Sequence, residues 1–363
     1  MLYNTTKQLK ELISRDFEYI KNNNKRVRIF FDIRGMAINI HDRQGSEMLA
    51  RYYDRDLPVY SNKLINIFNN WFQFFEQHKL ELEIIGFAEF GESKYHNEIL
   101  DNTYKLRRRL ERAKRVPELI RKKASDYIKS ELTNLAGTLN VPGSKAVIIL
   151  ANEIEIDCTP SFINNYCSID PDRYVNYIFS KDKDMVQSIS DNTKQVIKVV
   201  RSDYAVLDKT NCLSKGLKVN LEKDPKYASL ILSILGDSAD SIPGLNGIGP
   251  KGIEKLFLDY EYDEDSEEDM ITHFANSVSE VKPQVKQEIE KLRKSYKCVD
   301  FDIIIRENEE LLNKAIRDKY NSTVNCSTLG SKTNKIYQVE QRLKTVHNCV
   351  SELEYAWLLR SIK

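Results

Sequence analysis

The sequence predicts an α/β protein with a mostly parallel central sheet flanked by helices. Two observations lead to this prediction. Short apolar runs alternate with longer, helix-like stretches through the first two hundred residues, and acidic residues follow the apolar runs. Strands of a parallel sheet are buried on both faces, so their sequences are continuous runs of apolar residues. The alternation of strand and helix favours right-handed crossovers within one open sheet.

Five apolar runs are predicted to be strands. They are Val27–Phe31, Leu82–Ala88, Ala146–Leu150, Val175–Phe179 and Val196–Val200. Between them, apolar residues at helical spacing predict helices over Lys63–His78 and Glu118–Leu139. From about residue 205 the pattern becomes mostly helical. Loops are expected at Asp259–Asp269, where eight of eleven residues are acidic, and at 322–335.

The composition excludes several classes of protein. The six cysteines are scattered without a CxxC pair or a histidine clamp, which predicts free thiols in a reducing compartment. No stretch approaches the roughly 18 apolar residues that a membrane span requires. The polar segment Met1–Lys10 lacks the apolar core of a signal peptide. We therefore expect a cytoplasmic protein that has no membrane partner.

The net charge of +1 conceals a strongly basic stretch. Ten Lys and Arg residues lie between Lys105 and Lys123, where only Glu111 and Glu118 are acidic. Charge runs commonly form a solvated face, which is the expectation for the acidic run at Asp259–Asp269. The basic run is denser than an exposed helix requires, so a surface for a polyanion is an equal alternative.

Acidic residues stand at the ends of four predicted strands. They are Asp32 after the first, Glu89 after the second, Glu155 and Asp157 after the third, and Asp182 and Asp184 after the fourth. In an open parallel sheet, ligands bind beyond the carboxyl ends of the strands. Carboxylates brought together there repel one another unless a cation lies between them, and oxygen-only ligation selects Mg²⁺ or Mn²⁺. Two such ions are the usual means of cleaving a phosphodiester. For any single acid, the alternative is a cap on the following helix.

Glycine is scarce, yet five of the 13 glycines fall between Gly236 and Gly252. Gly244–Lys251 is predicted to be a tight hairpin, because its glycines permit positive φ and expose successive backbone N–H groups. With Lys251 beside them, these groups would hold a phosphate without recognising a base sequence. The alternative is a glycine-rich turn between packed helices.

Two further carboxylates precede this hairpin. A helix is predicted over Tyr227–Leu235 and runs into Gly236. Asp237 and Asp240 follow, with the spacing to face the same way on a helical turn. They are candidates for two more metal ligands.

The segment Gly236–Lys251 (GDSADSIPGLNGIGPK) resembles the helix–three-turn–helix signature of the 5′-nucleases. This family comprises flap endonucleases, the 5′→3′ exonuclease domains of bacterial DNA polymerase I and bacteriophage enzymes. Ser180–Gln187 is similar to its Ser/Thr-x-Asp-x-Asp-x-x-Gln element. Glu89–His96, followed by Tyr104, Lys105 and Arg108, is similar to its Asp-x-Gly-x-Ser-x-Phe-Arg…Tyr-Lys-x-x-Arg stretch. Tyr296–Asn321 resembles the C-terminal helical region of the bacteriophage members, to which the chain is most similar.

By this resemblance the chain is a structure-specific, divalent-metal-dependent 5′ nuclease acting on DNA or RNA–DNA in replication or repair. Two Mg²⁺ ions are implied, for which Mn²⁺ substitutes. The implied ligands are Asp32, Glu89, Glu155 and Asp157 for one ion, and Asp182, Asp184, Asp237 and Asp240 at the second. The implied catalytic residues are Lys105 and Arg108, which contact the scissile phosphate and stabilise its developing charge.

The resemblance also implies how DNA is held. The basic stretch becomes a helical arch for a single-stranded 5′ end, and the glycine hairpin grips the duplex with a K⁺ ion against its carbonyls. The implied DNA-binding residues are Arg107, Arg109, Arg112, Arg115, Gly244, Gly247, Gly249 and Lys251. The implied partners are DNA with 5′ flaps or 5′ ends, RNA–DNA primers and replication proteins such as a single-strand-binding protein. If the chain is encoded by a bacteriophage, its location is the host cytoplasm.

The domains expected from this resemblance are an α/β nuclease core over 1–205, with the helical arch at about 105–135, and a C-terminal helical domain over 206–330. This second domain contains the helix–three-turn–helix motif. Residues 331–363 form a C-terminal segment. Its last predicted helix, Ser351–Ile362, is expected to pack onto the protein's own core, with docking to a partner as the alternative.

Three residues depart from the family pattern. Glu89 stands where Asp is usual, Cys158 stands where bacterial and phage members have an acid, and His96 replaces an Arg. These departures motivate an alternative function: a protein of the same fold that binds branched DNA with reduced or absent catalysis. A small ribonuclease of the toxin type shares the strand-end acids, but such domains are short and carry no duplex-binding hairpin.

Overall fold

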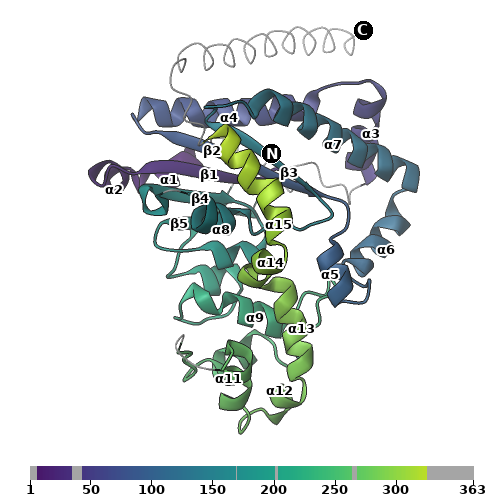
Figure 1. Cartoon of the computed structure of the whole chain (residues 1–363), viewed down its shortest axis with the longest axis vertical. Helices are drawn as coiled ribbons and strands as arrows, with labels where there is room; N and C mark the ends of the chain where they lie inside the picture. Colours follow the sequence, from purple (N-terminus) through teal and green to yellow (C-terminus); the bar gives the residue numbers. More distant parts are fainter. Residues whose placement is uncertain (1–5, 35–42, 169, 201–202, 264–267, 325–363) are drawn as a thin grey trace. The chain divides into compact units, whose positions relative to one another are not determined.

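The structure is a computed structural model that describes residues 6–34, 43–168, 170–200, 203–263 and 268–324. The chain divides into two compact units. The first comprises Met1–Ala88, Val116–Leu150 and Lys314–Lys363, and the second comprises Glu89–Arg115 and Ala151–Asn313. Each unit is therefore built from segments that are far apart in sequence (Figure 1).

A six-stranded, mostly parallel sheet confirms the predicted fold class. In the first unit its strands are β1 (Arg26–Asp32), β2 (Leu82–Phe90) and β3 (Ala146–Asn152), in the order β3-β2-β1. Strands β1 and β2 pair in parallel, with Val27 opposite Leu82 and Asp32 opposite Phe87. Burial is nearly continuous along all three strands, as the apolar runs predicted.

The expectation that Glu89 closes the second strand was wrong by one residue, because β2 continues to Phe90. The backbone N–H of Glu153 donates to the carbonyl of Phe90 at 2.9 Å, which extends the ladder past Glu89. Glu89 therefore lies within a strand.

Helices of the first unit are α1 (Lys7–Ser14), α2 (Phe17–Asn22), α3 (Arg43–Asp54), α4 (Val59–Gln77), α7 (Glu118–Leu139) and α16 (Asp318–Thr323). Helix α7 packs along α3 and α4 (Figure 1). The hydroxyl of Tyr127 on α7 accepts from the backbone N–H groups of Val59 and Tyr60, each at 3.1 Å. It thereby satisfies two donors at the start of α4, where no side chain of α4 provides a cap.

A buried charge ties α16 to the sheet of the first unit. Arg28 in β1 is 0% exposed. Its Nε lies 3.2 Å from Oε2 of Glu83 on β2, and its Nη2 donates to the hydroxyl of Tyr320 at 2.7 Å. An unpaired buried guanidinium would be strongly destabilising, so these contacts fix the register of three elements together.

Strands of the second unit are β4 (Tyr174–Phe179), β5 (Thr193–Val200) and β6 (Asp203–Leu207). Strand β4 pairs with β5 in parallel, and β5 pairs with β6 in antiparallel fashion. Strand β6 was not predicted, because the run from Tyr204 to Leu207 is short and lies where the sequence turns mostly helical.

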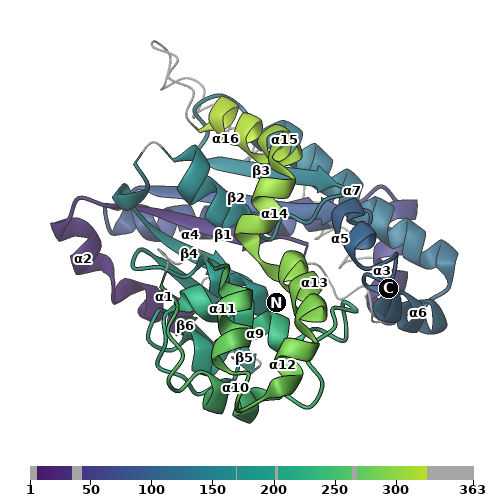
Figure 2. The ribbon, with the colours of Figure 1, turned by 60° about the horizontal axis from the view of Figure 1, so that its bottom comes forward.

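The second unit contains an apolar core and, among its described residues, the following helices. They are α5 (Lys94–Ile99), α6 (Leu106–Arg115), α8 (Thr159–Phe162), α9 (Ala228–Leu235), α10 (Pro250–Leu256), α11 (Met270–Ser277), α12 (Pro283–Gln287), α13 (Ile289–Val299), α14 (Phe301–Glu307) and α15 (Glu309–Leu312). Short 3₁₀ turns include Lys183–Ser188 and Pro225–Tyr227. Helix α9 is buried almost throughout and packs against α13 (Figures 1 and 2).

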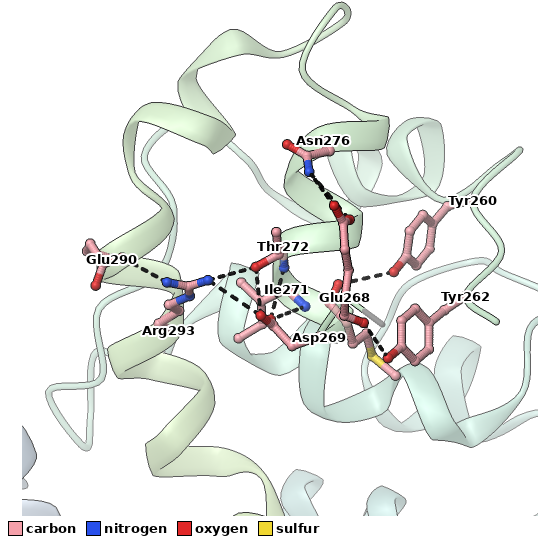
Figure 3. A network of polar contacts seen from close by, with 10 residues as sticks. Tyr260, Tyr262, Glu268, Asp269, Ile271, Thr272, Asn276, Glu290 and Arg293 are labelled. Carbon is pink, nitrogen blue, oxygen red and sulfur yellow. Dashed lines mark hydrogen bonds and ion pairs between the residues drawn. The ribbon is translucent and has the colours of Figure 1, made fainter. Parts of the chain in front are cut away.

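The predicted acidic loop ends in an ordered network (Figure 3). Asp269 caps α11 by accepting from the N–H groups of Ile271 and Thr272 at 3.1 and 3.0 Å. Arg293 of α13 lies 3.4 Å from the same carboxylate and donates to the hydroxyl of Thr272 at 2.7 Å. Residues 264–267 of this loop, and most of the loop predicted at 322–335, lie outside the described residues.

Cys158, Cys167, Cys212 and Cys298 are free and buried, in agreement with the prediction for these four. Cys326 and Cys349 lie outside the described part of the chain. None of the helices that the structure describes has the length and apolar character needed to span a bilayer.

Candidate active site

The candidate site residues fall into both units. Asp32 ends β1 in the first unit. It faces Tyr60, whose pKa is raised well above its usual value by burial and then by Asp32. The other seven candidate carboxylates, together with Lys105 and Arg108, all belong to the second unit.

Four of these carboxylates form an acidic cluster: Asp182, Asp184, Asp237 and Asp240. The pKa of Asp184 is raised well above its usual value, first by burial and then by Asp182, and the opposing charge of Lys183 does not cancel this effect, to which Asp237 and Asp240 add. Its Oδ1 is buried and has no hydrogen-bond partner. A carboxylate in such surroundings is unstable as an anion unless a cation is bound beside it. The donor set consists of oxygens alone, which suits a hard divalent ion.

The first half of the acidic cluster is positioned by side chains of the Ser180–Gln187 motif. Asp182 stands before the 3₁₀ turn, and its Oδ1 accepts from the N–H of Asp184 at 3.0 Å. The hydroxyl of Ser180 accepts from the N–H of Asp182 at 3.1 Å. At the other end, Gln187 donates to the carbonyl of Val299 at 2.8 Å and accepts from Ser229 on α9 at 2.7 Å. Asp182 is thus both a cap and a candidate ligand.

The other two carboxylates of the acidic cluster, Asp237 and Asp240, lie in a hydrogen-bonded turn. The prediction that they lie on a helical turn was wrong. Gly236 ends α9 with φ +66°, and Asp237 forms an antiparallel bridge with Ile242. Oδ1 of Asp237 accepts from the N–H groups of Ala239 and Asp240 at 2.8 and 3.3 Å. This capping by the aspartate competes with helix formation. It still places the two residues within one hydrogen-bonded turn.

Basic side chains compensate the acidic cluster at Asp237 and Asp240. Nζ of Lys183 lies 3.2 Å from Asp237, and Nη2 of Arg108 lies 2.7 Å from Asp240. Burial alone would raise the pKa of Asp237, but Lys183 and the turn N–H groups lower it. For Asp240, burial prevails over Lys105 and Arg108 and raises the pKa to about 6.

A further ion pair, outside the acidic cluster, joins Lys105 to Glu155. Nζ of Lys105 is hydrogen-bonded to Glu155, and the hydroxyl of Tyr104 donates to the same oxygen at 3.1 Å. Burial opposes ionisation of Glu155, yet Lys105 lowers its pKa to about 2. The backbone N–H of Lys105 also donates to the carbonyl of Asp240 at 2.9 Å. Both candidate phosphate-contacting cations are therefore held against candidate metal ligands.

Glu89 and Asp157 lie near this arrangement. Glu89 acts electrostatically on Lys105, and Asp157 on Tyr104. Cys158 is 1% exposed, and burial followed by the charge of Asp157 raises the pKa of its thiol. It is a neutral thiol and supplies no anionic ligand. Within the described residues, no three acidic, His or Cys side chains already stand in a metal-binding arrangement.

His96, which stands in place of the family's Arg, is buried. It stacks on Tyr104 with ring centroids 4.5 Å apart. Its Nε2 donates to the carbonyl of Cys298 at 2.9 Å, so Nδ1 is left to accept from Ser93 at 2.7 Å. Burial lowers its pKa, which keeps the ring neutral. The sequence did not indicate that His96 stacks on Tyr104.

The glycines around the hairpin divide into two kinds. A Cβ on Gly236 would lie 2.3 Å from the backbone N of Gly244, and a Cβ on Gly244 would lie 2.4 Å from the carbonyl O of Leu235. These two glycines are required for packing. Gly247, with φ +70°, and Gly249 have nothing within 4 Å of the corresponding position. They leave the backbone open to an approaching ligand.

Two side chains that the sequence did not indicate hold the tip of this hairpin. Glu288 accepts from the backbone N–H and the side-chain amide of Asn246 at 3.3 and 3.1 Å. Gln284 of α12 donates to the carbonyl of Asn246 at 2.9 Å. Neither residue lies in a recognisable motif, so only the fold reveals their role. Lys251 is exposed in the first turn of α10.

Helix α6 carries the candidate DNA-binding arginines and buries no side chain. Arg107 pairs with Glu111 at 3.1 Å, and Arg109 pairs with Glu92. Arg112 is half-buried and Arg115 is exposed. Beyond this helix, α7 carries a buried face over Ala124–Leu139. Exposed basic character is therefore concentrated before residue 124.

No protein-family model matches the chain. DNA polymerase I of Borreliella burgdorferi is 34% identical over 88 residues, which cover 24% of this chain and 9% of that protein. A 5′-3′ exonuclease of Aquifex aeolicus is 31% identical over 136 residues, which cover 36% of this chain and 42% of that protein. The chain thus spans less than half the length of these curated relatives.

Solved structures share the fold over a larger part of the chain. The 5′-exonuclease of bacteriophage T5 with bound zinc matches with a TM-score of 0.57 and 16% identity, covering 82% of this chain and 100% of that one. The bacteriophage T5 flap endonuclease, in a complex with DNA and metal ions, matches with a TM-score of 0.56 and 15% identity, covering 82% and 99%. The resemblance to 5′-nucleases is therefore confirmed, and the fold is that of the bacteriophage T5 enzyme.

The repulsion at Asp184 predicts a pH-dependent stability in the absence of divalent metal. An aspartate whose folded pKa is raised binds more protons in the folded state, so stability falls as pH rises above its unfolded value of about 4. Asp184→Asn removes this effect. From about pH 5 to about pH 8, the variant should become more stable than the unchanged protein, by about 1 kcal/mol or ~1 to 2 °C in Tm for a chain of 363 residues.

The measurement is thermal unfolding in a chelating buffer, repeated with added Mg²⁺, which should raise Tm of the unchanged protein more than that of the variant. Asp191→Asn, at an exposed carboxylate paired with Lys209 at 3.1 Å, is the control. A lower Tm for Asp184→Asn at about pH 8 would contradict the proposed repulsion.

The two kinds of glycine predict opposite outcomes for the same substitution. Gly244→Ala should destabilise the fold by several kcal/mol, on the order expected for overpacking against backbone. Gly249 has a φ of −101° and open space where a Cβ would lie. Gly249→Ala should therefore leave Tm unchanged, while affinity for duplex DNA should fall. Thermal unfolding and fluorescence anisotropy separate the two effects. Equal losses of Tm in both variants would refute the division.

Proposed function

We propose that the chain is a divalent-metal-dependent 5′ nuclease that cleaves DNA bearing a 5′ end or a 5′ flap. The observation that carries this proposal is the acidic cluster, in which Asp184 is buried, surrounded by three carboxylates and short of a partner at one oxygen. Such a cluster suits a bound cation, and the fold is that of a nuclease solved with DNA and metal ions.

Mg²⁺ is the ion that this oxygen-only site favours, with Asp182, Asp184, Asp237 and Asp240 as ligands of one ion and Asp32, Glu89, Glu155 and Asp157 as ligands of a second. Bound there, the ions would activate a water and neutralise charge on the leaving oxygen. The chain's own contribution is to hold Lys105 and Arg108 against Glu155 and Asp240 until a phosphate replaces these carboxylates as their partner.

The surfaces for DNA follow from the hairpin and the basic helix. Gly247 and Gly249 present open backbone, and Asn246 is fixed by Glu288, so the hairpin is preorganised for phosphates of a duplex. Helix α6 supplies positive charge for a single-stranded 5′ end. In this proposal Gly236–Lys251, with α9 and α10, acts as a helix–three-turn–helix motif, and a K⁺ ion lies against the hairpin carbonyls.

The proposed biological setting is replication or repair, with RNA–DNA primers among the substrates and a single-strand-binding protein among the partners. The competing function is binding of branched DNA without cleavage. The neutral Cys158 beside Asp157 favours it, because a position that is acidic in phage relatives supplies no charge here.

The deciding experiment uses a labelled 5′-flap duplex with and without Mg²⁺. Release of short labelled fragments only when Mg²⁺ is present would support the nuclease. Tight binding with no product at any Mg²⁺ or Mn²⁺ concentration would establish the binding protein instead. Preference for single-stranded RNA over the flap duplex would reject both in favour of a ribonuclease.

Asp182→Asn and Asp237→Asn each keep the oxygen that accepts the turn N–H groups while removing the negative charge. Cleavage should fall at least ~100-fold, because a lost metal ligand removes several kcal/mol of transition-state stabilisation. DNA affinity should remain within about threefold. Rates of product release from the flap duplex test this, with Asp172→Asn as an exposed control. Near-normal rates in either variant would exclude that residue as a ligand.

Neutralising Arg107, Arg108 and Arg109 together should weaken DNA binding and reduce its salt dependence. Each lost phosphate contact lowers the slope of log K against log salt by about 0.7 for single strands. The matched control replaces the exposed Lys215, Lys218 and Lys226, which also removes three charges from the second unit. An unchanged slope for the arginine variant, measured on a 5′-flap substrate, would separate α6 from DNA binding.

A further inference from the structure

Every carbonyl at the C-terminal end of α13 has a hydrogen-bond partner. A helix leaves its last four carbonyls without partners inside its own ladder. In α13 the first of these, on Tyr296, accepts from the N–H of Asp300 at 2.9 Å. The other three accept from side chains: Tyr95 on Lys297 at 3.0 Å, His96 on Cys298 at 2.9 Å and Gln187 on Val299 at 2.8 Å.

These three side chains come from segments that position the candidate site. Tyr95 and His96 lie on α5, and the ring of His96 stacks on Tyr104. Gln187 lies in the 3₁₀ turn that follows the first aspartate of the acidic cluster, and it also accepts from Ser229 on α9 at 2.7 Å. The C-terminal end of α13 therefore joins α5, this 3₁₀ turn and α9, in keeping with the packing of α13 against α5 and α9 (Figures 1 and 2).

The opposite end of α13 holds the glycine hairpin. Glu288, which immediately precedes the helix, accepts from the backbone N–H and the side-chain amide of Asn246 at 3.3 and 3.1 Å. Lys291, in the first turn, lies 3.3 Å from the same carboxylate. Farther along the helix, the hydroxyl of Ser295 donates to the carbonyl of Pro243 at the start of the hairpin. The hairpin and the candidate site are thus attached to one helix.

We propose that α13 is a strut through which the position of the hairpin sets the geometry of the acidic cluster. Glu288 at one end, and Tyr95, His96 and Gln187 at the other, are its positioning residues. The helix has 11 residues, so it is roughly 16 Å long. A rigid element with fixed partners at both ends carries a displacement from one end to the other. This proposal rests on the proposed function, because a duplex seated on the hairpin would then set the carboxylates for cleavage.

The backbone offers a second route between the hairpin and the acidic cluster. Asp237 pairs with Ile242, which lies two residues before Gly244. A displacement that followed this route would act first on the turn over 237–242. A displacement through α13 acts on α5 and on the 3₁₀ turn over Lys183–Ser188, because their side chains cap the helix. The two routes therefore predict effects in different segments.

Hydrogen exchange of backbone amides, measured by mass spectrometry in a chelating buffer, tests the strut without metal or DNA. Glu288→Ala removes both acceptors that hold Asn246. Exchange in Lys94–Ile99 and Lys183–Ser188 should become about threefold to tenfold faster. Strand β4, Tyr174–Phe179, belongs to the same unit and should exchange as in the unchanged protein.

The matched control is Glu290→Ala. Glu290 also lies at the start of α13, but it is exposed and pairs with Arg293 of the same helix at 3.1 Å. Its removal takes away the same charge and a similar interaction with the helix dipole. Exchange in α5 and in the 3₁₀ turn should stay unchanged in this variant.

Cleavage of a 5′-flap duplex in Mg²⁺ gives a second measurement. If Glu288 only held the hairpin, Glu288→Ala would raise KM and leave kcat unchanged. The strut predicts that kcat also falls several-fold at saturating substrate, because the carboxylates are displaced even when DNA is bound. Glu288→Gln keeps one oxygen as an acceptor for Asn246 and should recover part of this loss.

Four results would overturn the strut: unchanged exchange in α5 and the 3₁₀ turn of Glu288→Ala, faster exchange confined to 237–242, equally faster exchange in β4, or the same effects in Glu290→Ala. A normal kcat with a raised KM would likewise restrict Glu288 to the hairpin. Absence of cleavage by the unchanged protein would refute the proposed nuclease instead, and hydrogen exchange would still decide whether α13 joins the two regions.

Discussion

Repulsion among buried carboxylates is the constraint on which the second unit depends. Asp184 is buried beside Asp182, Asp237 and Asp240, and this arrangement is costly for every charge within it. Three basic residues offset part of the cost: Lys183 at Asp237, and Arg108 and Lys105 at Asp240. The remaining deficit at Asp184 is the specific feature that a bound cation would remove.

The surrounding hydrogen bonds keep these groups in place against that repulsion. Gln195 donates to the carbonyls of Ser180 and Asp182 at 3.1 and 2.6 Å, and Gln187 joins the 3₁₀ turn to α9 and α14. On the other side, Gly236 ends α9 and turns Asp237 toward Lys183. The hydrogen bonds of this network therefore hold like charges close together. Such an arrangement is typical of a site that a bound ligand stabilises.

Most of the strands and the long helices could be predicted from the sequence, because buried segments have a clear pattern of apolar residues. Five apolar runs became strands, and Glu118–Leu139 became α7 with the same bounds. It also indicated which acids follow the strands. It did not reveal β6, whose run is too short, or the turn at Asp237, where a side-chain cap competes with helix geometry. The roles of Glu288 and His96 depend on partners about forty and two hundred residues away, Asn246 and Cys298, and no local pattern encodes such contacts.

The close approach of Gly236 and Gly244 has an evolutionary consequence. Each position leaves no space for a side chain because the backbone of the other, or of Leu235, already fills it. A single mutation at either site damages folding, whatever the protein binds. Gly249 is not constrained in this way, because a side chain there would meet no atom of the protein and could affect only a bound partner. In a lineage that lost whatever ligand approaches this hairpin, Gly249 would therefore be replaced early, while Gly236 and Gly244 would be retained for as long as the fold is kept.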